Sequence, residues 1–151
     1  MTRQSKMQGE PVEILLVEDD PDHAELIIRG LEGNLVANQI HHVSDGEAAL
    51  DYLFRRGEYA DAVKSSRPHL ILLDLRLPKI DGLEVLREIK QDEVLRRIPV
   101  VVLTSSAAES DIAGACDNYV NSYLVKPVEF DEFRRMMRDL GFYWLAWNQH
   151  P

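Results

Sequence analysis

Five short apolar segments, separated by stretches with helical periodicity, constrain the fold of this chain more than any other feature. Three of them are nearly continuous runs of Val, Ile and Leu, which is typical of strands buried on both faces of a parallel sheet. The predicted strands are Val12–Val17, Gln39–Val43, His69–Leu73, Pro99–Leu103 and Ser122–Val125. Strands that alternate with helices in this way predict a doubly wound α/β fold, with a five-stranded parallel sheet and helices on both faces.

Helical periodicity fills the stretches between these strands. Apolar residues at i, i+3, i+4 and i+7 form one apolar stripe along a helix. Four such sets occur, and they are Ala24, Ile27, Ile28 and Leu31; Gly46, Ala49, Leu50 and Leu53; Gly82, Val85, Leu86 and Ile89; and Ile112, Ala115, Cys116 and Tyr119. A fifth helix is predicted to start near Glu129 and to run past Leu140, which gives five helices in all.

Capping residues support three of the helix starts. Asp20 stands before Pro21, and proline favours the first position of a helix. Ser44 and Asp81 each stand three residues before a glutamate, which is the spacing of a capping box. We therefore expect Asp20, Ser44 and Asp81 to be helix N-caps.

The size and charge of the chain limit its class. It has 151 residues and no apolar run near the ~20 residues of a membrane helix, so we expect one cytoplasmic domain without membrane contact. Residues 1–10 are polar and predict a disordered tail. Residues 11–147 are expected to form the domain, with an extended C-terminal helix and no separate output domain. A net charge of −9 disfavours nucleic acid as a partner.

Polar residues that can do chemistry follow four of the five predicted strands. Glu18 and Asp19 follow the first, Asp74 the third, Thr104 the fourth and Lys126 the fifth, whereas the second strand contributes nothing comparable. Doubly wound sheets bind ligands outside the carboxyl ends of their strands. Clustered carboxylates need a neutralising cation, and oxygen ligands suit Mg²⁺. With a lysine and a hydroxyl nearby, the pattern predicts a phosphoryl-transfer site.

Five motifs carry a family resemblance. They are Leu15–Asp20, Leu72–Pro78, Asp81-Gly82, Val102–Ser105 and Tyr123–Pro127. On these motifs the chain resembles the response-regulator receiver domain of two-component signalling, from about residue 13 to residue 140. The resemblance implies a flavodoxin-like strand order of 2-1-3-4-5. It also implies a stand-alone regulator, not an enzyme, that receives its phosphoryl group from a sensor histidine kinase and acts through protein contact.

The same resemblance implies the residues of the metal and phosphoryl site. Asp74 would accept the phosphoryl group and would also be a ligand of the metal, and the protein would assist its own phosphorylation and dephosphorylation. Glu18 and Asp19 would hold Mg²⁺, Asp19 directly and Glu18 through water. The backbone carbonyl of Arg76 would complete the metal site. The Arg76 side chain departs from the wider family pattern, because a bulky cation two positions after Asp74 can reach the phosphoryl group.

Three further residues would couple the phosphoryl group to the rest of the domain. By resemblance, Thr104 would hydrogen-bond a phosphoryl oxygen and act as the switch. Tyr123 would turn inward when Thr104 moves. Lys126 would pair with Asp74 and then with the phosphate.

A narrower likeness points to a possible kinase. The stretches Asn118–Tyr123 and Gly141–Leu145, and the long connection from Arg55 to Pro68 that we expect to be a surface loop, resemble single-domain regulators paired with bacterial and cyanobacterial phytochromes. A bacteriophytochrome is therefore one expected kinase partner.

Two other functions fit parts of the pattern. A Mg²⁺-dependent phosphatase could use Asp74 as its nucleophile, but that class usually has a second Asp where this chain has Arg76. A degenerate receiver could act as an adaptor without phosphorylation, although the complete set of site residues argues against it.

Apolar residues near the C-terminal end predict a homodimer. One stripe at spacings of three and four would pack on the sheet and comprises Phe130, Phe133, Met137, Leu140 and Trp144. A second apolar face, formed by Met136, Tyr143 and Trp147, is left over for a partner copy. The alternative is a helix that ends near Gly141 and a tail that folds back on its own domain.

Overall fold

The computed structural model describes residues 12–32, 38–61, 67–104 and 122–125, together with Asp131 and Arg135. Its five parallel strands are β1 (Val12–Val17), β2 (Asn38–Val43), β3 (Leu70–Asp74), β4 (Val100–Thr104) and β5 (Ser122–Val125). They form one sheet in the order β2-β1-β3-β4-β5. This arrangement confirms the predicted fold class and strand order.

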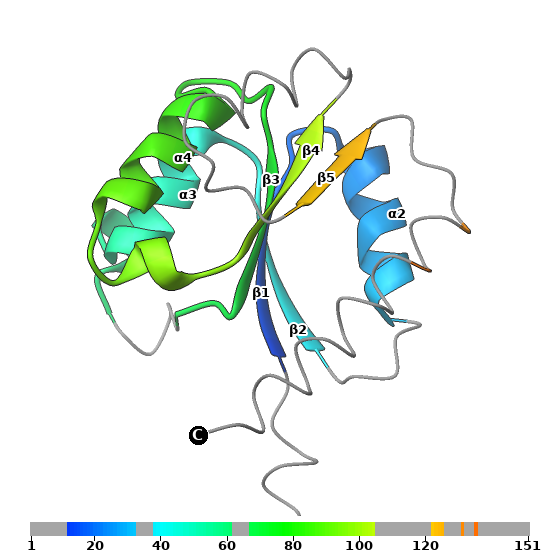
Figure 1. Cartoon of the computed structure of the whole chain (residues 1–151), viewed down its shortest axis with the longest axis horizontal. Coiled ribbons are helices and arrows are strands. Elements are labelled where there is room, and N and C mark those ends of the chain that lie inside the picture. The colour runs from blue at the N-terminus through cyan, green and yellow to red at the C-terminus, as the bar shows by residue number, and fades with distance from the viewer. Residues whose placement is uncertain are drawn as a thin grey trace, which may run out of the picture.

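Helices cover both faces of the sheet. The described α-helices are α2 (Pro21–Glu32), α3 (Gly46–Phe54) and α4 (Gly82–Gln91). Figure 1 shows α2 on one face and α3 and α4 together on the other. Short 3-10 turns, η1 (Gly57–Tyr59) and η2 (Leu95–Arg97), follow α3 and α4. The predicted helix around residues 112–119, the tail 1–10 and the dimer stripe lie outside the described residues. Of the predicted final helix only Asp131 and Arg135 are described, and both are helical.

Alternation along the strands divides the core into two layers. Leu15 and Val17 of β1 pack with the residues of α3 and α4, whereas Ile14 and Leu16 pack with those of α2. Successive side chains of a strand point to opposite faces, so a continuous apolar run serves both layers. The three helical stripes predicted within the described residues also face inward, and Ile28 is the one member that stays partly exposed.

Local details differ from the predicted boundaries. Asp74 and Thr104 are the last residues of β3 and β4 instead of following them, because their backbones still pair with the neighbouring strands. The N-cap of α3 is Asp45, not Ser44. The Asp45 carboxylate accepts a hydrogen bond from the Ala48 amide at 2.7 Å. The predicted caps Asp20 and Asp81 are confirmed by bonds from the amides of their helices.

Three rings form an aromatic cluster, His41, Tyr52 and Tyr59, where β2 meets α3 and η1. The His41 ring stacks on Tyr52 with centroids 4.3 Å apart, and Tyr59 meets both rings edge-on. Burial lowers the pKa of His41, His42 acts in the same direction, and Glu58 opposes them. Burial also raises the pKa of Tyr59. The connection after α3, expected to be a surface loop, thus contributes a half-buried ring to the core.

Within the described part of the chain, no helix is both long enough and apolar enough to span a membrane.

Candidate functional site

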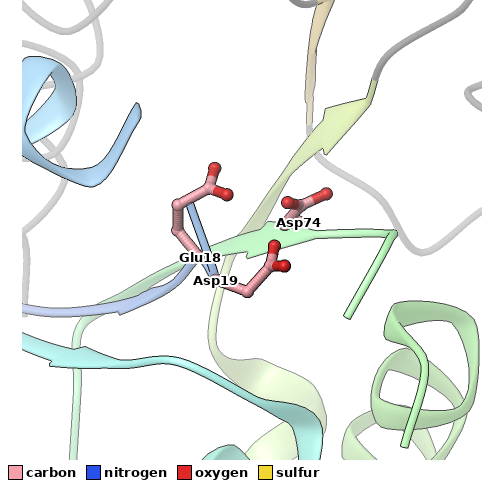
Figure 2. A group of neighbouring side chains, drawn as sticks. All are labelled: Glu18, Asp19 and Asp74. Carbon is pink, nitrogen blue, oxygen red and sulfur yellow. The ribbon is translucent and has the colours of Figure 1, made fainter. Parts of the chain in front are cut away.

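The parallel pairing of β1 and β3 brings carboxylates together at one edge of the sheet. Val17 and Leu73 are register partners, so the next residues along the two strands, Glu18 and Asp74, lie side by side. Asp19 follows in the same turn. Each of the three residues offers a carboxylate oxygen, and these oxygens lie within 4.8 Å of one another (Figure 2). We call these residues the acidic trio.

Glu18 is the most enclosed member of the trio, with no exposed surface. Its backbone N–H donates to the Val43 carbonyl at the end of β2. Its carboxylate accepts a hydrogen bond from the Asp20 amide at 3.1 Å, which closes a tight turn around Asp19. Asp19 is exposed. The turn therefore holds one buried and one accessible carboxylate beside Asp74.

Asp74 is held at the end of β3 and is 4% exposed. Its Oδ1 accepts a hydrogen bond from the backbone amide of Arg76 at 2.9 Å. Glycine is required at Gly82, because a Cβ there would lie 2.3 Å from the Asp74 carbonyl oxygen. The Gly82 amide donates to the Leu75 carbonyl at 3.0 Å. The start of α4 thus packs directly against the backbone of Asp74.

The loop between β3 and α4 is fixed from its other side by α3. The Gly46 amide donates to the Pro78 carbonyl, and a Cβ at Gly46 would lie 1.9 Å from the Ile80 carbonyl oxygen. Lys79 has a positive φ of 69° and its ammonium lies 3.6 Å from the Asp45 carboxylate. These contacts confine the loop that carries Arg76, and with it the amide that binds Asp74.

The composition of the trio defines what it can hold. Three like charges this close disfavour one another unless a cation lies among them. The donors are all carboxylate oxygens, which are the ligands of Mg²⁺, Ca²⁺ and Mn²⁺ rather than of softer metals. Mg²⁺ takes one or two carboxylates and keeps positions for water and a phosphate oxygen. The trio therefore fits the ligand preference of Mg²⁺, an ion that keeps coordination positions for water and a phosphoryl oxygen.

The structure describes the other residues predicted at the site only in part. The Arg76 side chain is exposed, while its amide binds Asp74. Thr104 ends β4, next to β3, and its Cα partner on β5 is Val125. Tyr123 of β5 pairs with Val102. The side chains of Thr104 and Tyr123, and the whole of Lys126, lie outside the described residues.

One contact at the site was missed by the sequence analysis, which assigned nothing to the second strand. His42, near the end of β2, places its Nε2 2.7 Å from the Glu18 carbonyl oxygen. The register Leu16–His42 puts this ring beside the turn that starts at Glu18. The alternation of His41 and His42 across the strand predicts which faces they occupy, but no sequence pattern signals a bond to a backbone carbonyl.

The chain thus combines a doubly wound parallel sheet with a carboxylate cluster, suited to a cation, at the carboxyl ends of β1 and β3. The response regulator receiver domain model matches residues 14–138. The chain therefore belongs to the receiver-domain family of response regulators in two-component signalling.

Several named regulatory proteins are similar to this chain in sequence or structure. The chain is 48% identical over 142 residues to the probable methanogenesis regulatory protein FilR2 of Methanothrix harundinacea, covering 94% of this chain and 89% of that protein. It matches the crystal structure of the phosphorylated cyanobacterial phytochrome response regulator RcpA with a TM-score of 0.78 and 44% identity, covering 91% and 96% of the two chains. It matches the crystal structure of the Mn²⁺-bound response regulator Rcp1, a protein of Synechocystis, with a TM-score of 0.76 and 43% identity, covering 89% of this chain and 95% of that chain.

Proposed function

We propose that this chain is a response regulator that accepts a phosphoryl group from a histidine kinase on Asp74, with Mg²⁺ held by Glu18 and Asp19. The observation that carries the proposal is the acidic trio, in which a buried carboxylate at the end of β3 faces two further carboxylates from the β1 turn. RcpA was solved in phosphorylated form and Rcp1 with Mn²⁺, and both resemble this chain over most of its length.

The chemical step follows from the position of Asp74. One carboxylate oxygen attacks the phosphorus atom of a phosphohistidine, a P–O bond forms, and the P–N bond breaks with its electron pair going to the ring nitrogen. Mg²⁺, when bound, neutralises the carboxylates and binds a phosphoryl oxygen. The Arg76 amide holds Oδ1 and so fixes the orientation of the carboxylate during the attack. The Arg76 backbone carbonyl is proposed to complete the metal site.

The output is proposed to pass along β4 and β5. Thr104 would bind a phosphoryl oxygen, Lys126 would pair with the phosphate, and Tyr123 would move with Thr104. The adjacency of β4 and β5, with Thr104 paired to Val125, supports this assignment because it brings these residues toward one region. A partner protein would then read the changed surface.

The phosphatase alternative receives less support from the site. A general acid two positions after the nucleophile would have to come from Arg76, a side chain that cannot lose its proton in a protein. The trio also argues against a phosphorylation-independent adaptor, since buried like charges are costly unless they bind something. Phosphoryl acceptance without sustained phosphatase turnover distinguishes our proposal from the enzyme.

Labelling of the wild type and Asp74→Asn tests the proposal. Both are incubated with Mg²⁺ and a small acyl phosphate, and phosphoprotein is separated by phosphate-affinity electrophoresis. Asp92→Asn is the matched control, because it removes a carboxylate that caps the turn after α4. Labelling of wild type and Asp92→Asn, with none in Asp74→Asn, supports the assignment. Equal labelling of Asp74→Asn refutes it.

Kinase choice and self-association are separate proposals. We propose a bacteriophytochrome-type histidine kinase as one source of the phosphoryl group, on the likeness to RcpA and Rcp1. The chain is also 48% identical to FilR2, a probable methanogenesis regulatory protein, so the likeness is not confined to proteins named as phytochrome regulators. Phosphotransfer profiling against the histidine kinases of the source organism decides between inputs. We further propose that the chain forms a homodimer through its C-terminal apolar residues. Light scattering tests this proposal, and a monomer mass in both phosphorylation states would refute it.

A further inference from the structure

His42 occupies a position beside the acidic trio that neither the family pattern nor the trio itself explains. It is exposed and lies near the end of β2, the strand from which no site residue was expected. Its Nε2 approaches the Glu18 carbonyl oxygen to 2.7 Å, a distance within the range of strong N–H···O hydrogen bonds. A carbonyl oxygen only accepts, so Nε2 is the donor and carries the proton.

The accepting carbonyl belongs to the peptide unit that joins Glu18 to Asp19. Because this unit is planar, fixing its carbonyl also fixes the direction of the Asp19 amide and limits the rotation that sets the Asp19 side chain. The Glu18 N–H is bonded to the Val43 carbonyl, so β2 holds this residue through both of its backbone groups. The Asp20 amide on the Glu18 carboxylate closes the same turn from within.

We propose that His42 is a positioning residue for the metal site, which acts through the Glu18 carbonyl and presents Asp19 toward Asp74. Its nitrogen nearest the site is engaged by that carbonyl, so it orients the trio and does not ligate the ion. The inference rests on the proposed Mg²⁺ site and adds a residue to it. Outer contacts that orient a ligand commonly change metal affinity when they are removed.

Three variants separate positioning from general stability. His42→Leu removes the donor and puts an apolar side chain of moderate size in its place. His42→Gln keeps an N–H donor. His69→Leu is the control, because it removes a histidine that bonds a backbone amide, that of Glu13, at 2.9 Å at the other end of β1. Mg²⁺ affinity is measured by calorimetry at pH about 8, above the ordinary histidine pKa of about 6.5, and the free energy of unfolding is measured without metal.

The expected result is a three- to tenfold weaker Mg²⁺ affinity in His42→Leu, about the value of one hydrogen bond, with recovery in His42→Gln. His69→Leu should bind Mg²⁺ as the wild type does, whatever stability it loses. The inference would be overturned, with the proposed function left intact, if His42→Leu bound Mg²⁺ as the wild type does. Equal weakening of Mg²⁺ affinity in His42→Gln and His42→Leu would have the same consequence. A wild-type protein that binds no Mg²⁺ would overturn the proposed function and this inference with it.

Discussion

The acidic trio at the carboxyl ends of β1 and β3 and the aromatic cluster beside β2 both place titratable groups within the fold. In the cluster, His41 stacks on Tyr52 and meets Tyr59 edge-on, and burial lowers its pKa so that the neutral ring is favoured. In the trio, carboxylate oxygens of three residues lie within 4.8 Å of one another, and those of Glu18 and Asp74 also accept backbone amides. The cluster therefore uses its polar groups for packing, whereas the trio gathers like charges whose mutual repulsion a bound cation would relieve.

Because of this difference, we expect substitutions in the cluster to change mainly stability and substitutions in the trio to change mainly metal affinity. Removing a ring from the cluster should reduce stability and leave the metal site intact. Neutralising a member of the trio should instead weaken metal binding without reducing stability, because the substitution removes both a metal ligand and a repulsive charge. Variants in each region can therefore test whether stability and metal affinity are separable, and the expected effects differ in size.

The largest loss of stability is expected from Tyr52→Ala. Tyr52 is 5% exposed and contacts both other rings of the cluster. Truncation of a buried aromatic side chain costs about 3 kcal/mol or more, since apolar contacts are lost and a cavity remains. Urea unfolding measures the loss, and calorimetry of the folded variant should show unchanged Mg²⁺ affinity. A large loss of affinity in the folded protein would show that the two regions are coupled.

Asp19→Ala should give the next largest effect, on binding rather than folding. Asp19 is the exposed member of the trio, so its truncation creates no cavity. Loss of one unit charge from a cation site should weaken Mg²⁺ binding about tenfold or more. The control is Asp22→Ala, an exposed carboxylate in the first turn of α2. Equal Mg²⁺ affinities for the two variants would contradict the assignment of Asp19.

A smaller effect should appear in the pH dependence of stability. The pKa of His41 is lowered in the folded state, so the unfolded chain binds a proton first as the pH falls. Stability should therefore decline below pH about 6.5 and level off below the folded-state pKa. His41→Phe keeps an aromatic ring and removes this titration, so its profile should be flatter between pH about 7.5 and 5.5. Parallel profiles would exclude His41 as a contributor.

The sequence predicted the sheet and the convergence of all three members of the trio because both depend on local signals. Continuous apolar runs mark β1, β3 and β4, and their shared direction brings Glu18 and Asp74 to one edge. The cap of α3 was misplaced by one residue, since both Ser44 and Asp45 can accept hydrogen bonds and only the backbone geometry selects Asp45.

The contact of His42 could not be predicted in the same way. It depends on the register between β1 and β2 and on the direction of one backbone carbonyl, which residue types do not encode. The packing of Tyr59 on His41 was missed for a related reason, because a turn within a long connection gave no periodicity to recognise.

The opposing effects of charge and cation on the trio can be tested in one experiment. The free energy of unfolding is measured for the wild type and Asp19→Asn, each with and without Mg²⁺. Without Mg²⁺, Asp19→Asn should be the more stable by about 1 kcal/mol, the repulsion of unit charges near 4 Å in a watery environment. With Mg²⁺ at a hundredfold its dissociation constant, the wild type should gain about 2.7 kcal/mol and become the more stable. An unchanged order in Mg²⁺ would contradict the account that these carboxylates form one cation site.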